Sequence, residues 1–190
     1  TASYMAMSNV FALNGNVVFG GLFGGPGGGH YSTDNGLTSL TSSNPIAGQP
    51  LYSMAVNPVS GHIYAGTETD ATWLSTDHGA SFSPLTWATA TLNGCTIQQG
   101  NKGNIFGIAV SNDGSTIYEA ALRGLFRSTD NGASWQQVNV LGAGGCGQTG
   151  IGVFIDPNGY IYYQFTETTP AGPKMKRSID GGSNWTDYNS

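Results

Sequence analysis

Charged residues are scarce in this chain. Lys, Arg, Asp and Glu make up 9% of the 190 residues, whereas an average soluble domain contains about 25%. Only 6 residues are basic against 11 acidic ones, so the formal net charge is −5. A surface with so few cations is a poor partner for nucleic acid or for an anionic membrane, and neither partner is expected.

Long apolar runs and helical patterns are also missing. No apolar run approaches the roughly 18 residues that span a bilayer, so no membrane insertion is expected. No segment shows a sustained period of 3.6 residues with helix caps, which predicts few helices. The first residues, "TASYMAMSNV", contain no signal peptide. The low charge favours a secreted, extracellular protein, which would have lost its signal on maturation.

Histidine is also rare, and its positions argue against metal chemistry. His30, His62 and His78 fall in three separate predicted turns. A three-histidine site is therefore not expected, and no acidic cluster has the spacing of a calcium loop. We expect neither a metal nor another cofactor.

Glycine and turn residues are abundant, and they recur in an internal repeat. The segments are "STDNGLTS" (32–39), "STDHGASF" (75–82), "STDNGASW" (128–135) and "SIDGGSNW" (178–185). Their aspartates, Asp34, Asp77, Asp130 and Asp180, are 43, 53 and 50 residues apart. Recurrence of one segment at such similar spacings indicates one structural unit repeated along the chain.

Each unit contains four short apolar or alternating runs separated by turn residues. In the third unit the first three runs are "IFGIAV", "TIYEAA" and "GLFRS", and the repeated segment lies between the third run and the fourth. Alternating runs linked by Asn-Asp-Gly and Pro-Asn-Gly turns predict antiparallel strands. A repeat of about 45 to 50 residues with four antiparallel strands is typical of a β-propeller blade. We therefore predict an all-β single domain, residues 1–190, with about four blades at residues 1–40, 50–87, 104–140 and 150–188.

The repeated S-x-D-x-G-x-x-W pattern resembles the Asp box, or bacterial neuraminidase repeat, of sialidase-like, xyloglucanase-like and sortilin-type propellers. The resemblance implies that the box forms the turn between the third and fourth strands, on the face away from any active site. The aspartate accepts hydrogen bonds from turn N–H groups, glycine allows positive φ, and the aromatic side chain packs under the turn. The predicted structural residues are Asp34, Asp77, Asp130, Asp180, Gly36, Gly79, Gly132, Gly182, Trp135 and Trp185.

Ligands are expected on the opposite face, in the loops between second and third strands and in the linkers. Glu68, Glu119 and Glu167 occupy similar positions in successive units, and a glycosidase needs two facing carboxyl groups. These three residues are the candidate catalytic acids. The alternative is that they are solvated carboxylates in surface loops. Asp70 and Arg123 share these loops, and Tyr52 and Trp87 offer rings that stack on sugars. The predicted ligand-binding residues are Asp70, Arg123, Tyr52 and Trp87.

Sialidase activity is not favoured, because a substrate carboxylate is held by several arginines. Only Arg123, Arg127 and Arg177 occur, and the last two directly precede boxes.

Cys95 and Cys146 lie 51 residues apart, close to one repeat length, at similar positions in two linkers. They predict a disulfide between neighbouring blades, with two free thiols as the alternative.

Four blades leave three arrangements open. The chain forms a closed ring, forms a piece of a longer propeller, or forms an open arc that pairs with another subunit through its edges.

The favoured function is a secreted binding or assembly module directed at a carbohydrate or glycan. The alternatives are a fragment or relative of a glycoside hydrolase, xyloglucanase-like more than sialidase-like, and a self-associating extracellular structural protein.

Overall fold

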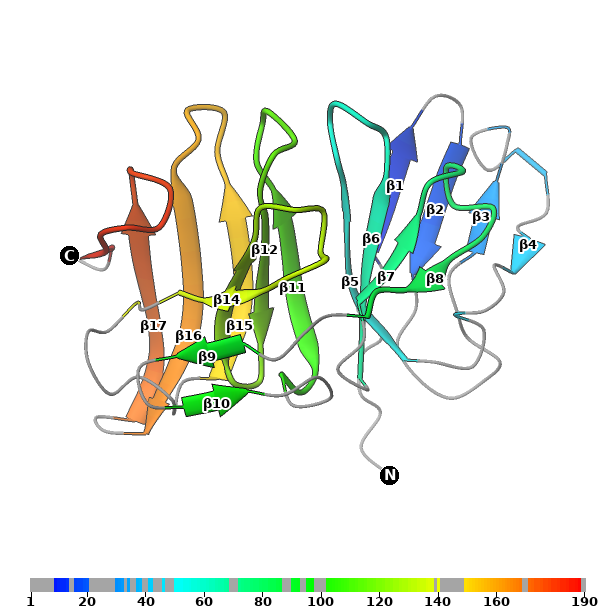
Figure 1. The fold of residues 1–190 in the computed structure, drawn as a ribbon. Coiled ribbons are helices and arrows are strands. Elements are labelled where there is room, and N and C mark those ends of the chain that lie inside the picture. Colours follow the sequence, from blue (N-terminus) through cyan, green and yellow to red (C-terminus); the bar gives the residue numbers. More distant parts are fainter. Residues whose placement is uncertain are drawn as a thin grey trace.

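The computed structural model consists of β-strands joined by turns (Figure 1). It describes residues 9–13, 16–20, 30–32, 34, 37–38, 41–42, 46, 50–68, 72–86, 90–92, 95–97, 102–138, 140, 149–168 and 171–188. Within these ranges there is no helix. The strands form four four-stranded antiparallel sheets and one two-stranded hairpin.

Each four-stranded sheet is one blade, with its strands paired in chain order. Blade 1 contains β1 (Asn9–Leu13), β2 (Asn16–Gly20), β3 (His30–Ser32) and β4 (Thr41–Ser42). Blade 2 contains β5 (Leu51–Val56), β6 (Ile63–Thr67), β7 (Thr72–Ser75) and β8 (Ser83–Pro84). Blade 3 contains β11 (Ile105–Val110), β12 (Ile117–Ala121), β13 (Gly124–Ser128) and β14 (Gln136–Gln137). Blade 4 contains β15 (Thr149–Ile155), β16 (Ile161–Thr168), β17 (Ala171–Ser178) and β18 (Thr186–Asp187).

Each blade is a meander, in which consecutive strands are joined by short turns whose polar groups form hydrogen bonds within the turn. Between β5 and β6, the Asn57 side-chain oxygen accepts the N–H groups of Val59 at 2.9 Å and Ser60 at 3.1 Å. In the matching turn of blade 3, Gly114 has a φ of 72°, which glycine adopts without steric cost. Such turns bring consecutive strands into antiparallel pairs with few connecting residues.

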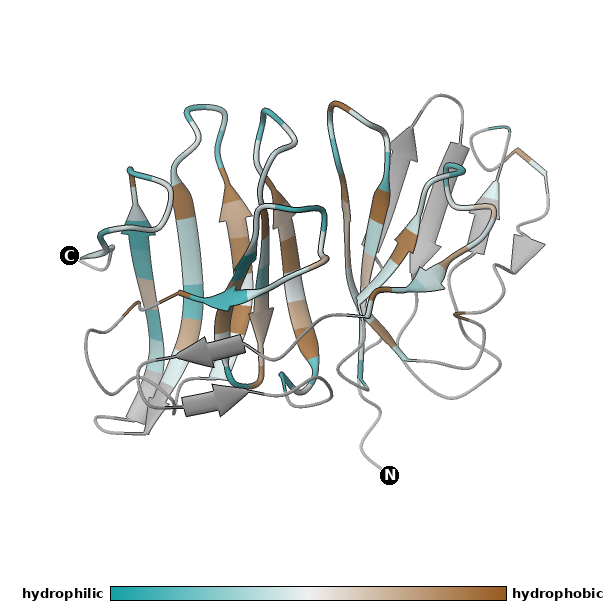
Figure 2. Ribbon diagram, viewed as in Figure 1, coloured by the Kyte–Doolittle hydropathy of each residue, from teal (hydrophilic) through white to brown (hydrophobic). Residues whose placement is uncertain are grey.

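The core lies between successive blades, and Figure 2 shows its apolar residues on the central strands. Between blades 2 and 3, Tyr64 and Ala55 pack against Ile117, Phe126 and Trp135. Between blades 3 and 4, a second cluster joins the two sheets. Its members are Tyr118, Ala120, Leu125, Val140, Ile161, Tyr163 and Phe165. Both faces of blade 3 are therefore covered by neighbouring blades.

Hydrogen bonds also tie the blades together. The Ser53 hydroxyl donates to the carbonyl of Ile105 at 3.0 Å, and the Asn57 amide donates to that of Gly114 at 2.9 Å. The Asn112 amide donates to the carbonyl of Asp156 at 3.0 Å. All three bonds satisfy main-chain acceptors at the blade junctions, and the Ser53 bond is buried, where an unpaired carbonyl would be destabilising.

The blades form an open arc. The first strands lie beside one another, with β1 against β5, β5 against β11, and β11 against β15. Among the described strands, β15 and β1 do not pack against each other, although a closed ring would require it, and Figure 1 shows them separated by β5 and β11. The closed four-blade ring, one of the three arrangements that the sequence permits, is therefore not the structure of this chain.

The predicted fold class is confirmed: the protein is all-β, with four-stranded antiparallel blades. The predicted linker after residue 87 contains a hairpin that we did not anticipate, β9 (Ala90–Leu92) and β10 (Cys95–Ile97). β9 lies against β14, so this hairpin adds to the fourth-strand side of blade 3. The blade 1 sheet ends at Ser42, just beyond the predicted limit of 40. That residues 1–190 form a single domain stays a prediction.

Candidate functional site

The strand pairing separates two ends of the molecule. Val56 pairs with Ile63, and Ile63 pairs with Ser75, so the turn after β5 and the repeated segment after β7 share one end. The start of β5, the end of β6 and the start of β7 lie at the other end. We call the turns around Asp34, Asp77, Asp130 and Asp180 the box turns, and their end of the molecule the box end.

Each box turn is held by its own side chains. In blade 3 the Ser128 hydroxyl donates to Asp130 at 2.8 Å and accepts the N–H of Gly132 at 2.8 Å. Asp130 also accepts the backbone N–H of Ser134 at 2.8 Å. The Trp135 ring N–H donates to the carbonyl of Gly132 at 3.1 Å. The same bonds recur around Asp180, where Asn184 replaces Ser134.

These bonds stabilise charged carboxylates. The backbone N–H and then the side-chain amide of Asn184 lower the pKa of Asp180 to about 2. Hydrogen bonds from Ser32 and Thr38 do the same for the pKa of Asp34, also to about 2. A carboxylate that donor groups hold in its ionised form is a weak general acid or base near neutral pH. The box aspartates therefore fit an architectural role, and Gly79, Gly132 and Gly182 have the positive φ that the turn requires.

The other end brings two predicted site residues together. The N–H of Glu68 donates to the carbonyl of Pro50 at 3.2 Å, which places Glu68 beside the start of β5. Burial raises the pKa of Tyr52, and the charge of Glu68 and a hydrogen bond to it raise it further. The Tyr52 ring also meets the ring of Phe106 edge-on, with centroids 5.4 Å apart. Tyr52, Phe106 and Glu68 form one cluster across blades 2 and 3.

A β-bulge produces this cluster, and it recurs in three blades. The register of the first strand shifts between Leu51 and Ser53, between Ile105 and Gly107, and between Gly150 and Gly152. The extra residues are Tyr52, Phe106 and Ile151, which we call the bulge row. A bulge re-aims its extra side chain. Tyr52 and Phe106 are half-buried and Ile151 is exposed, although the preceding residues Leu51, Ile105 and Gly150 are buried.

The prediction that Glu119 lies in a ligand-binding loop is wrong. It lies in the interior of β12, and its side chain is fully buried. The Lys102 ammonium lies 2.6 Å from one carboxylate oxygen, and the Thr72 hydroxyl of blade 2 donates to the other. Lys102 also lies 4.2 Å from the centre of the Trp135 ring. The buried group joins blades 2 and 3, and neither of its charged side chains is exposed to solvent.

The remaining predicted residues are dispersed or lie outside the described ranges. Arg123 is exposed after β12, and its carbonyl accepts the side-chain amide of Gln137 at 2.6 Å. Glu167 is the second-last residue of β16, where the backbone alone is described. Asp70, Trp87, Gly36 and Cys146 lie outside the described residues, and Cys95 is described through its backbone in β10. The Cys95–Cys146 disulfide stays a prediction.

Sequence reasoning missed Phe106 and Ile151. A signal existed, because both residues occupy the position of Tyr52 in aligned first strands, "LYS", "IFG" and "GIG". Within the described part of the chain, no group of three His, Cys, Asp or Glu side chains is arranged to hold a metal ion. The same part contains no helix long and apolar enough to cross a membrane.

Comparison with known proteins identifies the fold. No protein-family model matches the chain, and no curated protein matches it. Among solved structures, an ancestral GH74 enzyme superposes on 95% of the chain with a TM-score of 0.69 and 18% identity. The GH74 xyloglucanase from Xanthomonas campestris covers 91% with a TM-score of 0.65 and 17% identity. YCF48 bound to a D1 peptide covers 96% with a TM-score of 0.59 and 16% identity.

These similarities establish a propeller-type fold. The chain spans 25% of the ancestral GH74 chain, 29% of the Xanthomonas campestris chain and 52% of the YCF48 chain. The arc of four blades therefore corresponds to a part of those larger proteins. At such low identity, activities and partners are not transferred with the fold.

Proposed function

We propose that this chain is a secreted Asp-box propeller module that binds a neutral carbohydrate at the bulge row. The observation that carries the proposal is the same bulge in three consecutive blades, which turns Tyr52, Phe106 and Ile151 out of the blade cores. Regular strands would have kept these apolar side chains within the blade packing. Their repeated position outside the blade cores, half-buried at Tyr52 and Phe106 and exposed at Ile151, is suited to an extended ligand that contacts several blades.

The chemistry of the row supports a sugar. Aromatic faces match the apolar C–H faces of a pyranose ring, and carboxylates accept pairs of hydroxyl hydrogen bonds. Tyr52 and Phe106 supply the rings, and Glu68, exposed beside Tyr52, supplies the carboxylate. The two GH74 structures, one of them a xyloglucanase, support a carbohydrate ligand for this type of propeller.

Affinity electrophoresis against soluble polysaccharides tests the proposal, with xyloglucan and mixed-linkage β-glucan as probes. We expect Tyr52→Ala and Phe106→Ala each to weaken binding by about tenfold, the loss of about 1.4 kcal/mol of stacking. Glu68→Gln should weaken it less, because the amide still accepts one hydroxyl. Val59→Ala is the control, since this apolar side chain is 71% exposed in the turn after β5, at the box end of the molecule.

Two outcomes would change the interpretation. Binding that survives both Tyr52→Ala and Phe106→Ala in folded protein would exclude the bulge row as the site. Release of reducing ends from either glucan, abolished by Glu68→Gln, would favour the glycoside hydrolase alternative over a binding module. Such a result would leave the position of the site unchanged and redefine its chemistry.

A further inference from the structure

A cavity of about 150 Å³ lies where the third and fourth strands of blade 3 meet the box turn of blade 4. Its wall consists of Arg127, Gln136, Gln137, Val138, Gly182 and Ser183. A cavity of about this volume holds a molecule the size of benzene, so there is room for one small chemical group. Arg127 directly precedes the box serine of blade 3, so the cavity lies near the box end. It is therefore separate from the bulge row, which lies at the other end of the strands.

Arg127 is a half-buried cation without a carboxylate partner in the described part of the chain. Both ion pairs among the described residues involve other side chains. Asp130, the closest carboxylate along the chain, accepts hydrogen bonds from Ser128 and Ser134 of its own turn. A positive charge that is partly removed from water and lacks a counter-charge favours an anionic ligand.

The guanidinium of Arg127 has free donor groups. One N–H donates to the carbonyl of Gly181 at 3.2 Å, and another donates to the side-chain oxygen of Gln136 at 3.5 Å. The second bond is longer than the usual range of about 2.7–3.2 Å. The Nε–H makes no hydrogen bond with any residue that the structure describes. Nε and the neighbouring Nη2 carry parallel N–H groups, which is the geometry that binds both oxygens of a carboxylate.

Neutral polar groups surround this guanidinium. The amide nitrogen of Gln136, the amide oxygen of Gln137 and the hydroxyl of Ser183 form no hydrogen bond with the described residues. Such groups pair with hydroxyls, which both donate and accept. Val138 supplies an apolar surface for C–H groups. A carboxylate with hydroxyl groups beside it matches this wall, and a hexuronic acid carries that combination.

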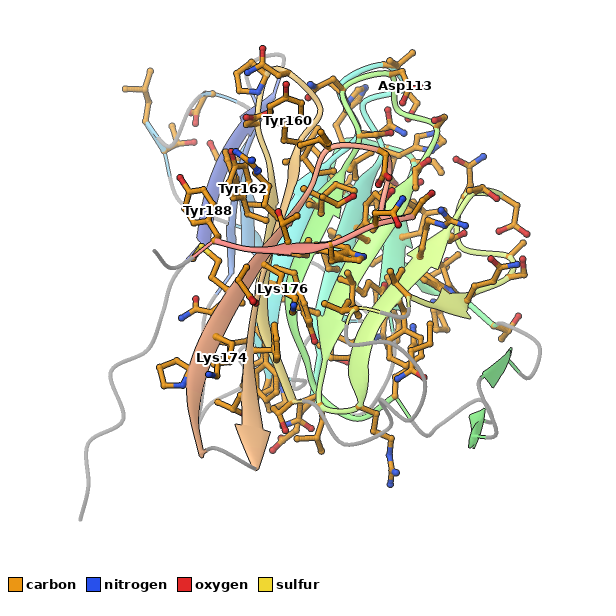
Figure 3. The ribbon with its side chains drawn as sticks, turned by 90° about the vertical axis from the view of Figure 1, so that its left-hand side faces the viewer. Asp113, Tyr160, Tyr162, Lys174, Lys176 and Tyr188 are labelled. Carbon is orange, nitrogen blue, oxygen red and sulfur yellow. The ribbon has the colours of Figure 1, made fainter. Side chains whose placement is uncertain are left out.

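Other cations face the same junction. Lys174 and Lys176 lie along β17 (Figure 3), and Lys176 is in an ion pair at 2.9 Å. Their cross-strand partners, Phe165 and Tyr163, belong to the cluster between blades 3 and 4. Because cross-strand partners point to the same face of a sheet, both lysines point toward this junction. With Arg127, three of the six basic residues lie at one junction of a chain with a net charge of −5, and their potential favours the approach of an anion.

One carboxylate of the blade 4 box turn limits the charge of the ligand. Asp180 accepts the N–H groups of Ser183 at 3.1 Å and Asn184 at 2.9 Å, so its oxygens are engaged within their own turn. A guanidinium near an ionised carboxylate suits a ligand with a single negative charge. A phosphate, which carries about two charges near neutral pH, is disfavoured.

We propose that this cavity binds the carboxylate of a sugar acid, with Arg127 as its partner and with Gln136 and Ser183 contacting the adjoining hydroxyls. The choice of a sugar rests on the proposed carbohydrate-binding function, whereas the choice of a carboxylate follows from Arg127 itself. The protein then has two ligand sites at opposite ends of its strands. The bulge row binds neutral units, and the cavity binds an acidic unit.

NMR titration of the whole chain tests the proposal. The probe is methyl β-D-glucuronide, and methyl β-D-glucoside is its neutral counterpart. The glucuronide should shift the Nε–H resonance of Arg127 and the backbone N–H resonances of Val138 and Ser183, with a dissociation constant on the order of 1 mM. The glucoside should shift none of the three. Added salt should weaken the binding of the glucuronide, because the charges are partly exposed.

Arg127→Gln should raise the dissociation constant at least tenfold, and Arg127→Lys nearly as much, because an ammonium lacks the parallel donors. In both variants Tyr118 still donates to the carbonyl of Gly181 at 3.0 Å, so the box turn keeps a partner. Ser183→Ala, at an exposed position, should weaken binding about threefold and tests the site even where the arginine variants fail to fold. Arg177→Gln is the matched control, because Arg177 has the same strand position in blade 4 and does not line the cavity.

Glucuronide binding that is equal in Arg127→Gln and the unaltered protein would overturn the proposal, as would the absence of shifts at all three resonances. Acetate is a third probe. Acetate that binds as tightly as the glucuronide would refute a sugar acid as the ligand, because the hydroxyl contacts would contribute nothing.

Tyr52→Ala separates this site from the bulge row. The variant should bind the glucuronide like the unaltered protein, and loss of that binding would place the acid at the bulge row and contradict the proposal. Glucuronide binding at Arg127 in a protein that binds no neutral glucan would refute the proposed function at the bulge row and leave this cavity as a site.

Discussion

Removal of Glu119 provides the sharpest test of how the blades are held together. Both side chains of the Lys102–Glu119 pair are fully buried, with 2.6 Å between ammonium and carboxylate. Removing one partner of such a pair leaves an uncompensated buried charge and costs about 3–5 kcal/mol. Glu119→Gln leaves the Lys102 ammonium above the Trp135 ring at 4.2 Å. This cation–π contact is present in both proteins and keeps the buried ammonium partly stabilised, so we expect the lower end of this range, about 3 kcal/mol.

The opposite truncation should be worse. Lys102→Met leaves the Glu119 carboxylate buried with the Thr72 hydroxyl as its described donor, so we expect about 4–5 kcal/mol. Replacing both residues, as Lys102→Met with Glu119→Leu, removes both charges and should recover most of the stability. The Thr72 hydroxyl then loses its acceptor, which limits the recovery by about 1–3 kcal/mol.

Thermal and urea unfolding of the four proteins measure these differences in stability. For a chain of this length, about 3 kcal/mol corresponds to a lowering of the melting temperature by roughly 6–12 °C. Carbohydrate binding by folded Glu119→Gln should equal that of the unaltered protein, since the side chain does not reach solvent. Single variants that each lose less than about 1 kcal/mol would refute the reasoning, because the pair would then behave like a solvated surface ion pair.

Two further predictions concern the box turns. Asp130→Ala should destabilise the protein by about 1–3 kcal/mol in urea unfolding and leave ligand affinity unchanged, because Asp130 satisfies donors of its own turn; unchanged stability with lost binding would contradict this. The box carboxylates should also make stability acid-sensitive: the pKa of Asp180 is lowered from 3.8 to about 2, so its contribution is present above pH 3.8 and disappears as the pH falls toward 2. The melting temperature of Asp180→Asn should therefore fall less over this range than that of the unaltered protein, and equal falls would count against the argument.

The fold and the box end could be predicted because their determinants are local. Within eight residues, the segment "STDNGASW" contains the hydroxyl, the carboxylate, the positive-φ glycine and the ring that hold the blade 3 turn. A turn stabilised by its own side chains looks the same wherever the blade is placed. Four copies at blade spacing then fix the strand order, because short turns permit antiparallel pairing of neighbours.

The candidate site was only partly predictable, because it depends on residues far apart in sequence. Tyr52 and Glu68 were identified separately, but their contact depends on the register of β5 against β6. Phe106 joins them through a bulge, which inserts one residue without a distinct residue type. Glu119 was misplaced because its partners, Lys102 and Thr72, are 17 and 47 residues away. A buried carboxylate cannot be told from a solvated one until such partners are known.

The open end of the arc shows the same limit most clearly. "HIYAGT", "TIYEAA" and "YIYYQF" each place a tyrosine after an isoleucine, at Tyr64, Tyr118 and Tyr162. By sequence the three are equivalent, yet Tyr64 and Tyr118 are buried under a following blade, whereas Tyr162 is only half-buried on the side of blade 4 that faces away from blade 3. The burial of such a tyrosine depends on the blade that packs against it, and the sequence of its own strand does not contain that information.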